Sequence, residues 1–280
     1  MRASPPRAWG LLGLLGLGAC DGEDEGASGS CGAGADEQVF VVQQMSFVRG
    51  EDGVSEGFDL DGIDGASCGV PDFASPGGDE GIDNAFSYLL PALELTEAAA
   101  VEQLLQDAID TGQLLLTLEL SGLDDANDDP CVSLQIGRAV GPPMLGTDGL
   151  LLWGQTLAAD SSLPAFDAGQ IPLIDGGLEA DAALSLPVDI FGVALQFDLL
   201  RGRMRADLQE DGSITGLFSG GVAVDYVLQV AREEDVDPSL AGIFETLLGL
   251  WADLAPDEAG ACTQFSVGIS YRAVPAFLLR

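Results

Sequence analysis

The sequence predicts an α+β fold that is mainly β, in which an antiparallel sheet or sandwich carries two packed helical segments. Strand-like segments outnumber helical patterns, and the helical patterns lie in two separate places along the chain. Residues 38–280 contain no internal repeat and no second linker, so we expect one β-rich globular domain. A domain of this length can bury roughly 70 to 75% of its unfolded surface, which is enough for a sizeable core.

The domain is predicted to begin with one strand and two short helices. Residues 38–48 are rich in Val and Phe, which is typical of a strand. Apolar residues at helical spacing over 86–93 indicate a short helix that Pro91 interrupts. A second helix is predicted from Thr96, with Gly112 as its stop.

Strand patterns dominate the middle of the chain. Residues 113–120 and 131–136 are predicted to pair as a hairpin, and residues 150–157 to form another short strand. Residues 184–230 are the most strand-like segment. Their apolar face changes parity near residues 200–202, which predicts a bulge or turn there.

The last elements are a hairpin, a helix and a strand. Asp211-Gly212 between two alternating runs is typical of a hairpin turn. Asp237 is a suitable N-cap and Pro238 a suitable first residue for a helix that ends before Pro256. The final strand is predicted over residues 264–273.

The N-terminus has the layout of an export signal. Arg2 and Arg7 precede an apolar run, and small residues then lead to Cys20. Residues 17–20, Leu-Gly-Ala-Cys, resemble the lipobox of bacterial lipoproteins, which implies that Cys20 is lipidated and becomes the first residue of the mature chain. The alternative is an ordinary secretory signal cut nearby. Both interpretations export the protein, and Asp21 leaves the choice of inner or outer membrane open.

Three regions follow from this interpretation. Residues 1–19 are the predicted signal peptide, and residues 20–37 a flexible acidic tether rich in Gly and Ser. Residues 38–280 are the predicted folded domain. We therefore expect a protein of the bacterial cell envelope that is held at a membrane by its lipid.

The charge and composition exclude several classes of function. Forty-six acidic residues stand against ten basic ones, a net charge of −36, so nucleic acid and anionic lipid surfaces would be repelled. All ten basic residues are Arg. The absence of His and Lys removes Ser-His-Asp and Cys-His nucleophiles, imidazole metal sites and Schiff-base lysines. Only carboxylate chemistry remains, and we expect a protein that is not an enzyme.

Four cysteines remain after Cys20 is assigned to the lipid, and an even number in an oxidising compartment predicts two disulfides. Three pairings are possible. Cys68 with Cys131 and Cys31 with Cys262 are preferred, because the first two lie beside acidic segments and the second two would join the ends of the domain.

Residues 57–84, here called the acidic loop, are the main candidate for a functional site. No basic residue lies between Arg49 and Arg138, while 20 acidic residues lie from Glu51 to Asp129. These carboxylates are solvated, paired with the distant arginines 201, 203 and 205, or bound to a cation. Calcium suits them best, because it takes six to eight oxygen ligands from carboxylates and loop carbonyls.

The spacing in the acidic loop does not match an EF-hand in any register, so we expect a calcium loop of another kind. The predicted ligands are Asp59, Asp61, Asp64, Asp79 and Asp83, with Asp72 as a weaker one. The alternative is that these acids occupy surface turns and that Asp83 caps the following helix. Residues 124–129 are a second acidic segment that is either a turn or an ion site.

The GFDLDG and GIDN segments around Cys68 are similar to segments of uncharacterised acidic lipoproteins from myxobacterial-type genomes. The resemblance implies export and a shared fold, with no known activity.

Together these observations predict a non-enzymatic, membrane-anchored lipoprotein that calcium stabilises and that serves as a binding or structural protein at the cell envelope. Two alternatives stay open. One is a carrier of an apolar ligand or lipid, because residues 184–230 are rich in Leu, Val and Phe. The other is a carboxylate-based hydrolase, such as a glycosidase, which needs only paired acids.

Overall fold

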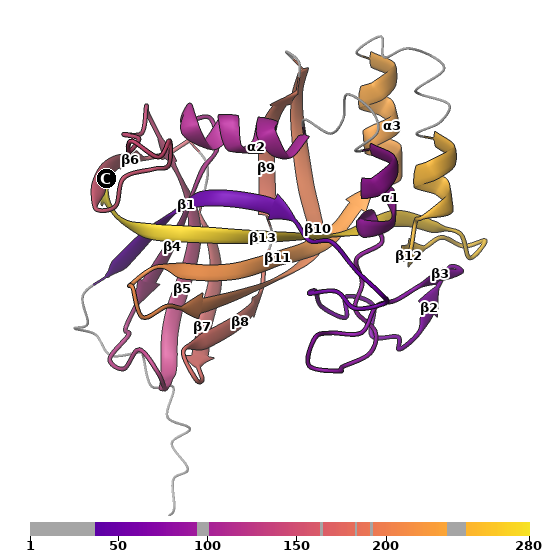
Figure 1. The fold of residues 1–280 in the computed structure, drawn as a ribbon, viewed down its shortest axis with the longest axis horizontal. Coiled ribbons are helices and arrows are strands. Elements are labelled where there is room, and N and C mark those ends of the chain that lie inside the picture. The colour runs from indigo at the N-terminus through magenta and orange to yellow at the C-terminus, as the bar shows by residue number, and fades with distance from the viewer. Residues whose placement is uncertain (1–36, 94–100, 163–164, 183, 191–192, 234–244) are drawn as a thin grey trace, which may run out of the picture.

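The computed structural model describes residues 37–93, 101–162, 165–182, 184–190, 193–233 and 245–280. Strands make up 51% of the structure and helices 14%, which confirms the α+β, mainly β class (Figure 1). The predicted signal peptide, the tether up to residue 36, Cys20 and Cys31 lie outside the described residues.

The elements run in the following order: β1 Gln38–Phe47, β2 Ala66–Ser67, β3 Val70–Pro71, α1 Phe86–Leu93, α2 Val101–Asp110, β4 Leu115–Ser121, β5 Asp129–Val140, β6 Gln155–Ala159, β7 Phe166–Leu173, β8 Gly177–Asp181, β9 Leu184–Ile190, β10 Val193–Leu208, β11 Ile214–Ala223, α3 Val224–Glu233, β12 Leu254–Pro256 and β13 Cys262–Leu279. Residues 245–250 are also helical.

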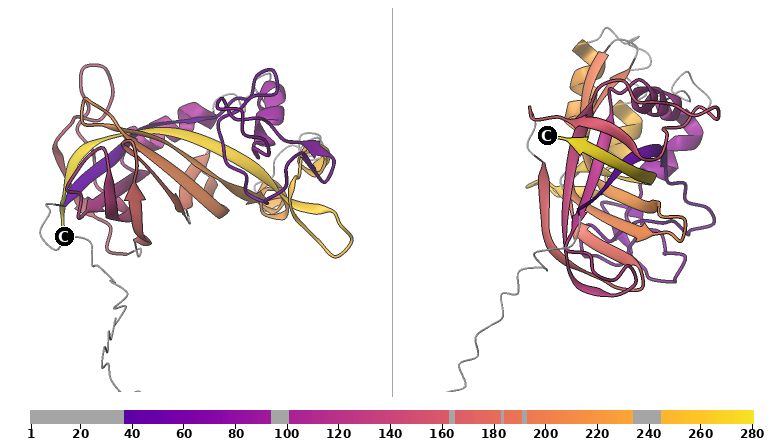
Figure 2. Two further views of the ribbon diagram at one scale, coloured as in Figure 1. Left: turned by 90° about the horizontal axis from the view of Figure 1, so that it is seen from below. Right: turned by 90° about the vertical axis from the view of Figure 1, so that its left-hand side faces the viewer.

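Eleven strands form one sheet, which the long strand β13 organises. β13 pairs with β1, β11, β12 and β6, and the order β1-β4-β5-β6-β13 returns to β1, so the strands close a ring (Figures 1 and 2). Among the described strands, the only parallel ladder joins β6 to β13. The sheet is therefore mixed, whereas the sequence predicted an antiparallel one.

One apolar cluster fills the interior and includes side chains from most of the large strands. In β4, every residue from Leu115 to Leu120 is buried, as expected for a strand that is paired on both edges and covered on both faces. Helix α2 packs against β1, and α1 lies near β13. In the segment that motivated the carrier alternative, Leu199, Met204 and Phe218 are buried members of this cluster.

The predicted bulge is confirmed. The register of β10 against β11 shifts between Leu200 and Arg203, and Arg201 has a φ of 51°. The predicted hairpin follows, with Leu208 opposite Ile214. Asp211 caps its turn by accepting hydrogen bonds from the backbone N–H and hydroxyl of Ser213.

Several elements differ from the prediction. The strand predicted over residues 150–157 begins later, since β6 starts at Gln155. Leu151 instead bridges to Leu145 across a loop. Strands β7 and β8 were not predicted. Residues 224–230 are helical because Val224, Val227 and Leu228 have helical spacing and pack on the core. Asp237 and Pro238 lie outside the described residues.

In the part of the chain that the structure describes, no helix has both the length and the apolar character needed to cross a membrane.

Candidate cation site

The acidic loop is ordered around its own apolar side chains. Phe58, Val70, Phe73 and Ile82 are each at most 5% exposed. Backbone bridges join Phe58 to Asp83 and Phe73 to Ile82. A side chain at Gly57 would approach Ile82 within 2.5 Å, so this position needs glycine for close packing. The loop is therefore a folded unit at one end of the sheet (Figure 1).

A buried amide fastens the end of the acidic loop to the sheet. Asn84 donates to the Val48 carbonyl at 3.1 Å and to the Ser55 hydroxyl at 2.9 Å. Its own oxygen accepts from the N–H of Gly268 in β13 at 3.2 Å. Asn84 is 1% exposed, so these bonds fix the residue next to Asp83 in a dry environment.

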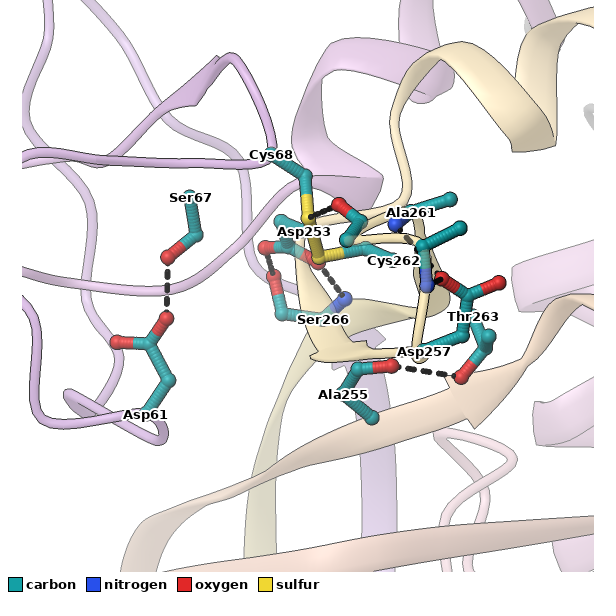
Figure 3. Close-up of a disulfide and its surroundings, with 12 residues drawn as sticks. Asp61, Ser67, Cys68, Asp253, Ala255, Asp257, Ala261, Cys262, Thr263 and Ser266 are labelled. Carbon is teal, nitrogen blue, oxygen red and sulfur yellow. Dashed lines mark hydrogen bonds between the residues drawn. A yellow bond between two sulfur atoms is a disulfide. The ribbon is translucent and has the colours of Figure 1, made fainter.

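A disulfide between Cys68 and Cys262 joins the acidic loop to the first residue of β13 (Figure 3). The preferred pairings of Cys68 with Cys131 and of Cys31 with Cys262 are therefore wrong. The fold brings Cys68 beside a residue 194 positions away, and the sequence carries no signal of that proximity. Cys131 is also disulfide-bonded.

Three of the predicted ligands come together. Asp59, Asp61 and Asp83 each place one carboxylate oxygen within 4.8 Å of the other two. Asp83 is 1% exposed, and its Oδ2 accepts from the Leu60 N–H at 2.6 Å. Its Oδ1 is buried and has no hydrogen-bond partner among the described residues. A buried carboxylate oxygen of this kind requires either a proton or a cation.

Burial raises the pKa of Asp83 from its ordinary value of 3.8 to about 8, and the nearby carboxylates of Asp253, Asp61 and Asp72 add to the rise. Burial and the charge of Asp61 raise the pKa of Asp72 to about 6. Asp72 Oδ2 is also buried without a hydrogen-bond partner in the described chain. Without a cation, the site therefore keeps a proton on Asp83 at neutral pH.

The other two members of the triad are shaped by local turns. Asp59 Oδ1 accepts from the Gly62 N–H at 2.6 Å. Asp61 Oδ1 accepts from the Ile63 N–H at 2.8 Å, and Asp61 Oδ2 accepts from the Ser67 hydroxyl (Figure 3). Since a carboxylate oxygen has two lone pairs, each group keeps acceptor capacity for an ion.

The remaining predicted ligands lie outside the triad. Asp64 is exposed and lies beside Gly81, where an added Cβ would approach its Oδ1 at 3.2 Å. Asp79 is exposed in a separate turn, in which the Ser75 hydroxyl donates to its Oδ2 at 3.0 Å.

Sequence reasoning missed Asp253, which supports the site from a distant segment. It is 2% exposed and accepts hydrogen bonds from the N–H and hydroxyl of Ser266 (Figure 3). The Ser266 hydroxyl in turn accepts from the Ala85 N–H at 2.7 Å, two residues after Asp83. The sequence signal that could have indicated Asp253 is its position between two apolar residues, Ala252 and Leu254, both of which are buried.

The second acidic segment has a structural explanation, and so does the part of β10 that carries Arg201, Arg203 and Arg205, here called the arginine strand. The Asp129 carboxylate accepts backbone N–H groups of Asp124 and Cys131, which makes residues 124–129 a hydrogen-bonded turn. Arg205 pairs with Glu56 at 2.8 Å, and Arg203 lies over the Phe58 ring at 4.7 Å.

None of the salt bridges among the described residues involves the Asp59, Asp61 and Asp83 triad. The arginine strand therefore braces the base of the acidic loop and leaves the charge of the triad unpaired.

Compared with known proteins, the chain matches no protein-family model, no curated protein and no solved structure.

Proposed function

We propose that this chain is an exported lipoprotein, anchored through Cys20, whose folded domain is a non-enzymatic, calcium-stabilised binding or structural protein of the bacterial cell envelope. The observation that carries the calcium assignment is Asp83 Oδ1, a buried oxygen without a partner among the described residues, beside the carboxylates of Asp59 and Asp61. The lipobox resemblance supports the anchor.

Calcium suits these ligands better than other common metals. All three side chains offer hard oxygen atoms, and the surrounding irregular backbone can add carbonyls and admit water. Zinc and copper sites usually use imidazole or thiolate, and the chain has no His, while Cys68 next to the site is in a disulfide. The proposed ion would tie the start of the acidic loop, at Asp59 and Asp61, to its end at Asp83 and stabilise its packing on the sheet.

A calcium titration tests this assignment. The melting temperature of the purified chain should rise with calcium, by about 5 to 10 °C at 100 times the dissociation constant, since that excess contributes about 2.7 kcal/mol. EDTA should reverse the rise. In Asp83→Asn the rise should be lost, while Asp79→Asn, a matched change in an exposed turn, should keep it. An equal rise in Asp83→Asn and the wild type would remove the ion from this site.

The anchor is tested separately. When the full-length chain is expressed in a bacterial host with labelled palmitate, the label should appear in the protein and the protein in the membrane fraction. Cys20→Ser should lose both. Retention of the label in Cys20→Ser would disprove the lipidation site without affecting the calcium assignment.

A further inference from the structure

Exposed apolar side chains gather at one end of the molecule. Twelve large apolar side chains are exposed among the described residues, and seven of them lie in residues 140–153 and 277–279. Four are in the loop before β6: Met144, Leu145, Leu152 and Trp153. Single exposed apolar side chains are common on protein surfaces, but a contiguous group of them marks an interaction surface. We call this group, with the exposed residues of the adjoining strands, the apolar end.

Strand pairing places the remaining three side chains together. Ala158 of β6 pairs with Val140 of β5 on one side and with Leu279 of β13 on the other. Phe277 pairs with Thr156, two residues away on the same face. Val140, Phe277 and Leu279 are 42%, 62% and 65% exposed. They therefore form one apolar strip across the three strands.

The loop before β6 is fastened to the same strands. The Gly154 N–H donates to the Pro275 carbonyl of β13 at 2.7 Å, and the Met144 N–H donates to the side chain of Gln155 at 2.8 Å. Leu152 donates back to the Met144 carbonyl at 2.9 Å. The apolar end is thus a built surface that the sheet supports.

The segments that form this surface carry little charge of their own, and the Arg272 guanidinium that lies over the Trp153 ring at 5.9 Å is paired with Asp211. Residues 139–159 contain one charged residue, Asp148, and residues 273–279 contain none. The whole chain has 20% charged residues and a net charge of −36. The apolar end is therefore where an uncharged, apolar surface can approach without repulsion.

The proposed lipid tether enters the domain at this end. Glu37, the first described residue, pairs with Arg280 at 2.6 Å, next to Leu279. The start of β1 pairs with the C-terminal part of β13, with Val39 opposite Ala276, on the left of Figure 1. Sixteen residues separate Cys20 from Glu37. The covalent geometry of a chain of that length limits its reach to roughly 55 Å.

We propose that the apolar end is a membrane-docking surface, on which the anchored domain rests at the boundary between headgroups and acyl chains of an uncharged, zwitterionic bilayer. This inference rests on the proposed lipid anchor. The anchor holds the surface at a high effective concentration near the bilayer, so weak contacts suffice. Trp, Phe and Leu side chains favour the membrane interface, and the acidic remainder of the domain faces away from the bilayer.

Tryptophan quenching tests the docking in the full chain, lipidated and reconstituted into phosphatidylcholine vesicles with brominated acyl chains. After removal of residues 1–19, the chain contains Trp153 at the apolar end and Trp251, which stacks on Tyr88 of α1. Helix α1 and β6 lie at opposite ends of the domain (Figure 1). In Trp251→Phe, the remaining Trp153 should be quenched strongly. In Trp153→Phe, the remaining Trp251 should not.

The outcomes separate the docking from the anchor. Vesicle flotation with unquenched Trp153 would overturn the docking alone, whereas failure to float would overturn the anchor and the docking together. Phe277→Ser with Leu279→Ser should abolish the quenching of Trp153, and Ile174→Ser, an equally exposed residue elsewhere at 62%, should not. A concentration-dependent dimer that the same pair of substitutions abolishes would assign the surface to a second copy of the chain and overturn the proposal.

Discussion

At the scale of single residues, Asp83 contributes to the pH dependence of folding without calcium. Its pKa of about 8 in the folded chain lies above the value of about 4 in an unfolded one, so the folded state holds the proton more tightly. This contribution to the free energy of unfolding is complete below about pH 4 and is lost as the pH rises to about 8. Urea titrations in EDTA should show the fall.

The same titrations on Asp83→Asn should give a flatter curve, because no proton is released from this position. Asp79→Asn, the same substitution at an exposed position, should follow the wild type. A curve for Asp83→Asn that runs parallel to the wild type would contradict the assignment of the buried proton.

Arg201 allows a second test at this scale. Its φ of 51° lies in the left-handed region, which glycine adopts at lower cost than other residues. Its side chain is exposed. Arg201→Gly should therefore raise the free energy of unfolding by about 1 kcal/mol. Arg203→Gly, two residues along the same strand, should lower it because Arg203 loses its contacts with Phe58 and Glu179. Destabilisation by Arg201→Gly would argue against the bulge.

At the scale of elements, one carboxylate fastens helix α2 to strand β1. Glu102 accepts from the Phe47 N–H at 2.8 Å and from the Arg49 guanidinium at 2.9 Å. The Arg49 hydrogen bond is the main cause that lowers the pKa of Glu102, so its stabilisation is present above about pH 4.3 and is lost in acid. Glu102→Gln should cost about 1 kcal/mol at pH 7, because the pair is partly exposed.

Chemical denaturation at pH 7 and pH 3 measures this cost. The difference between Glu102→Gln and the wild type should shrink at pH 3, and Asp107→Asn, exposed on the same helix, should be neutral at both values. A cost that does not change with pH would mean that the carboxylate charge is not what holds α2.

At the scale of the whole molecule, the disulfide between Cys68 and Cys262 is the longest covalent restraint among the described residues, across 194 positions. Replacing both cysteines by Ser should cost about 2 to 5 kcal/mol. Thermal melts of this variant, compared with the oxidised wild type, measure the loss. A variant as stable as the oxidised wild type would show that the acidic loop packs without the bond.

The sequence predicts the parts of this molecule that depend on local pattern. The strand at residues 38–48, the bulge near Leu200 and the hairpin at Asp211 follow from alternation and turn chemistry, and all are present. Strands β7 and β8 contain Gly and Asp and only one β-branched residue, Ile171, so their pairing with neighbours decides their state. The end of the predicted strand region became α3 because its apolar residues also fit helical spacing.

The site shows the same division between local and long-range information. Unmatched negative charge pointed to the acidic loop, and three of its six predicted ligands converge. The burial of Asp83, the support from Asp253 and Ser266, and the partner of Cys68 all come from β13 and the segment before it, about 170 to 195 positions away. No spacing within the loop could reveal them.

The closeness of the disulfide to the proposed ion has a consequence for both. The disulfide and the ion each restrain the acidic loop, so either one holds the loop in the ordered state that favours formation of the other. Thermodynamic reciprocity then requires the two effects to be equal: if breaking the Cys68–Cys262 bond weakens calcium binding by some factor, calcium must disfavour reduction of that bond by the same factor. Bound calcium would thus help to keep the thiols of this loop oxidised.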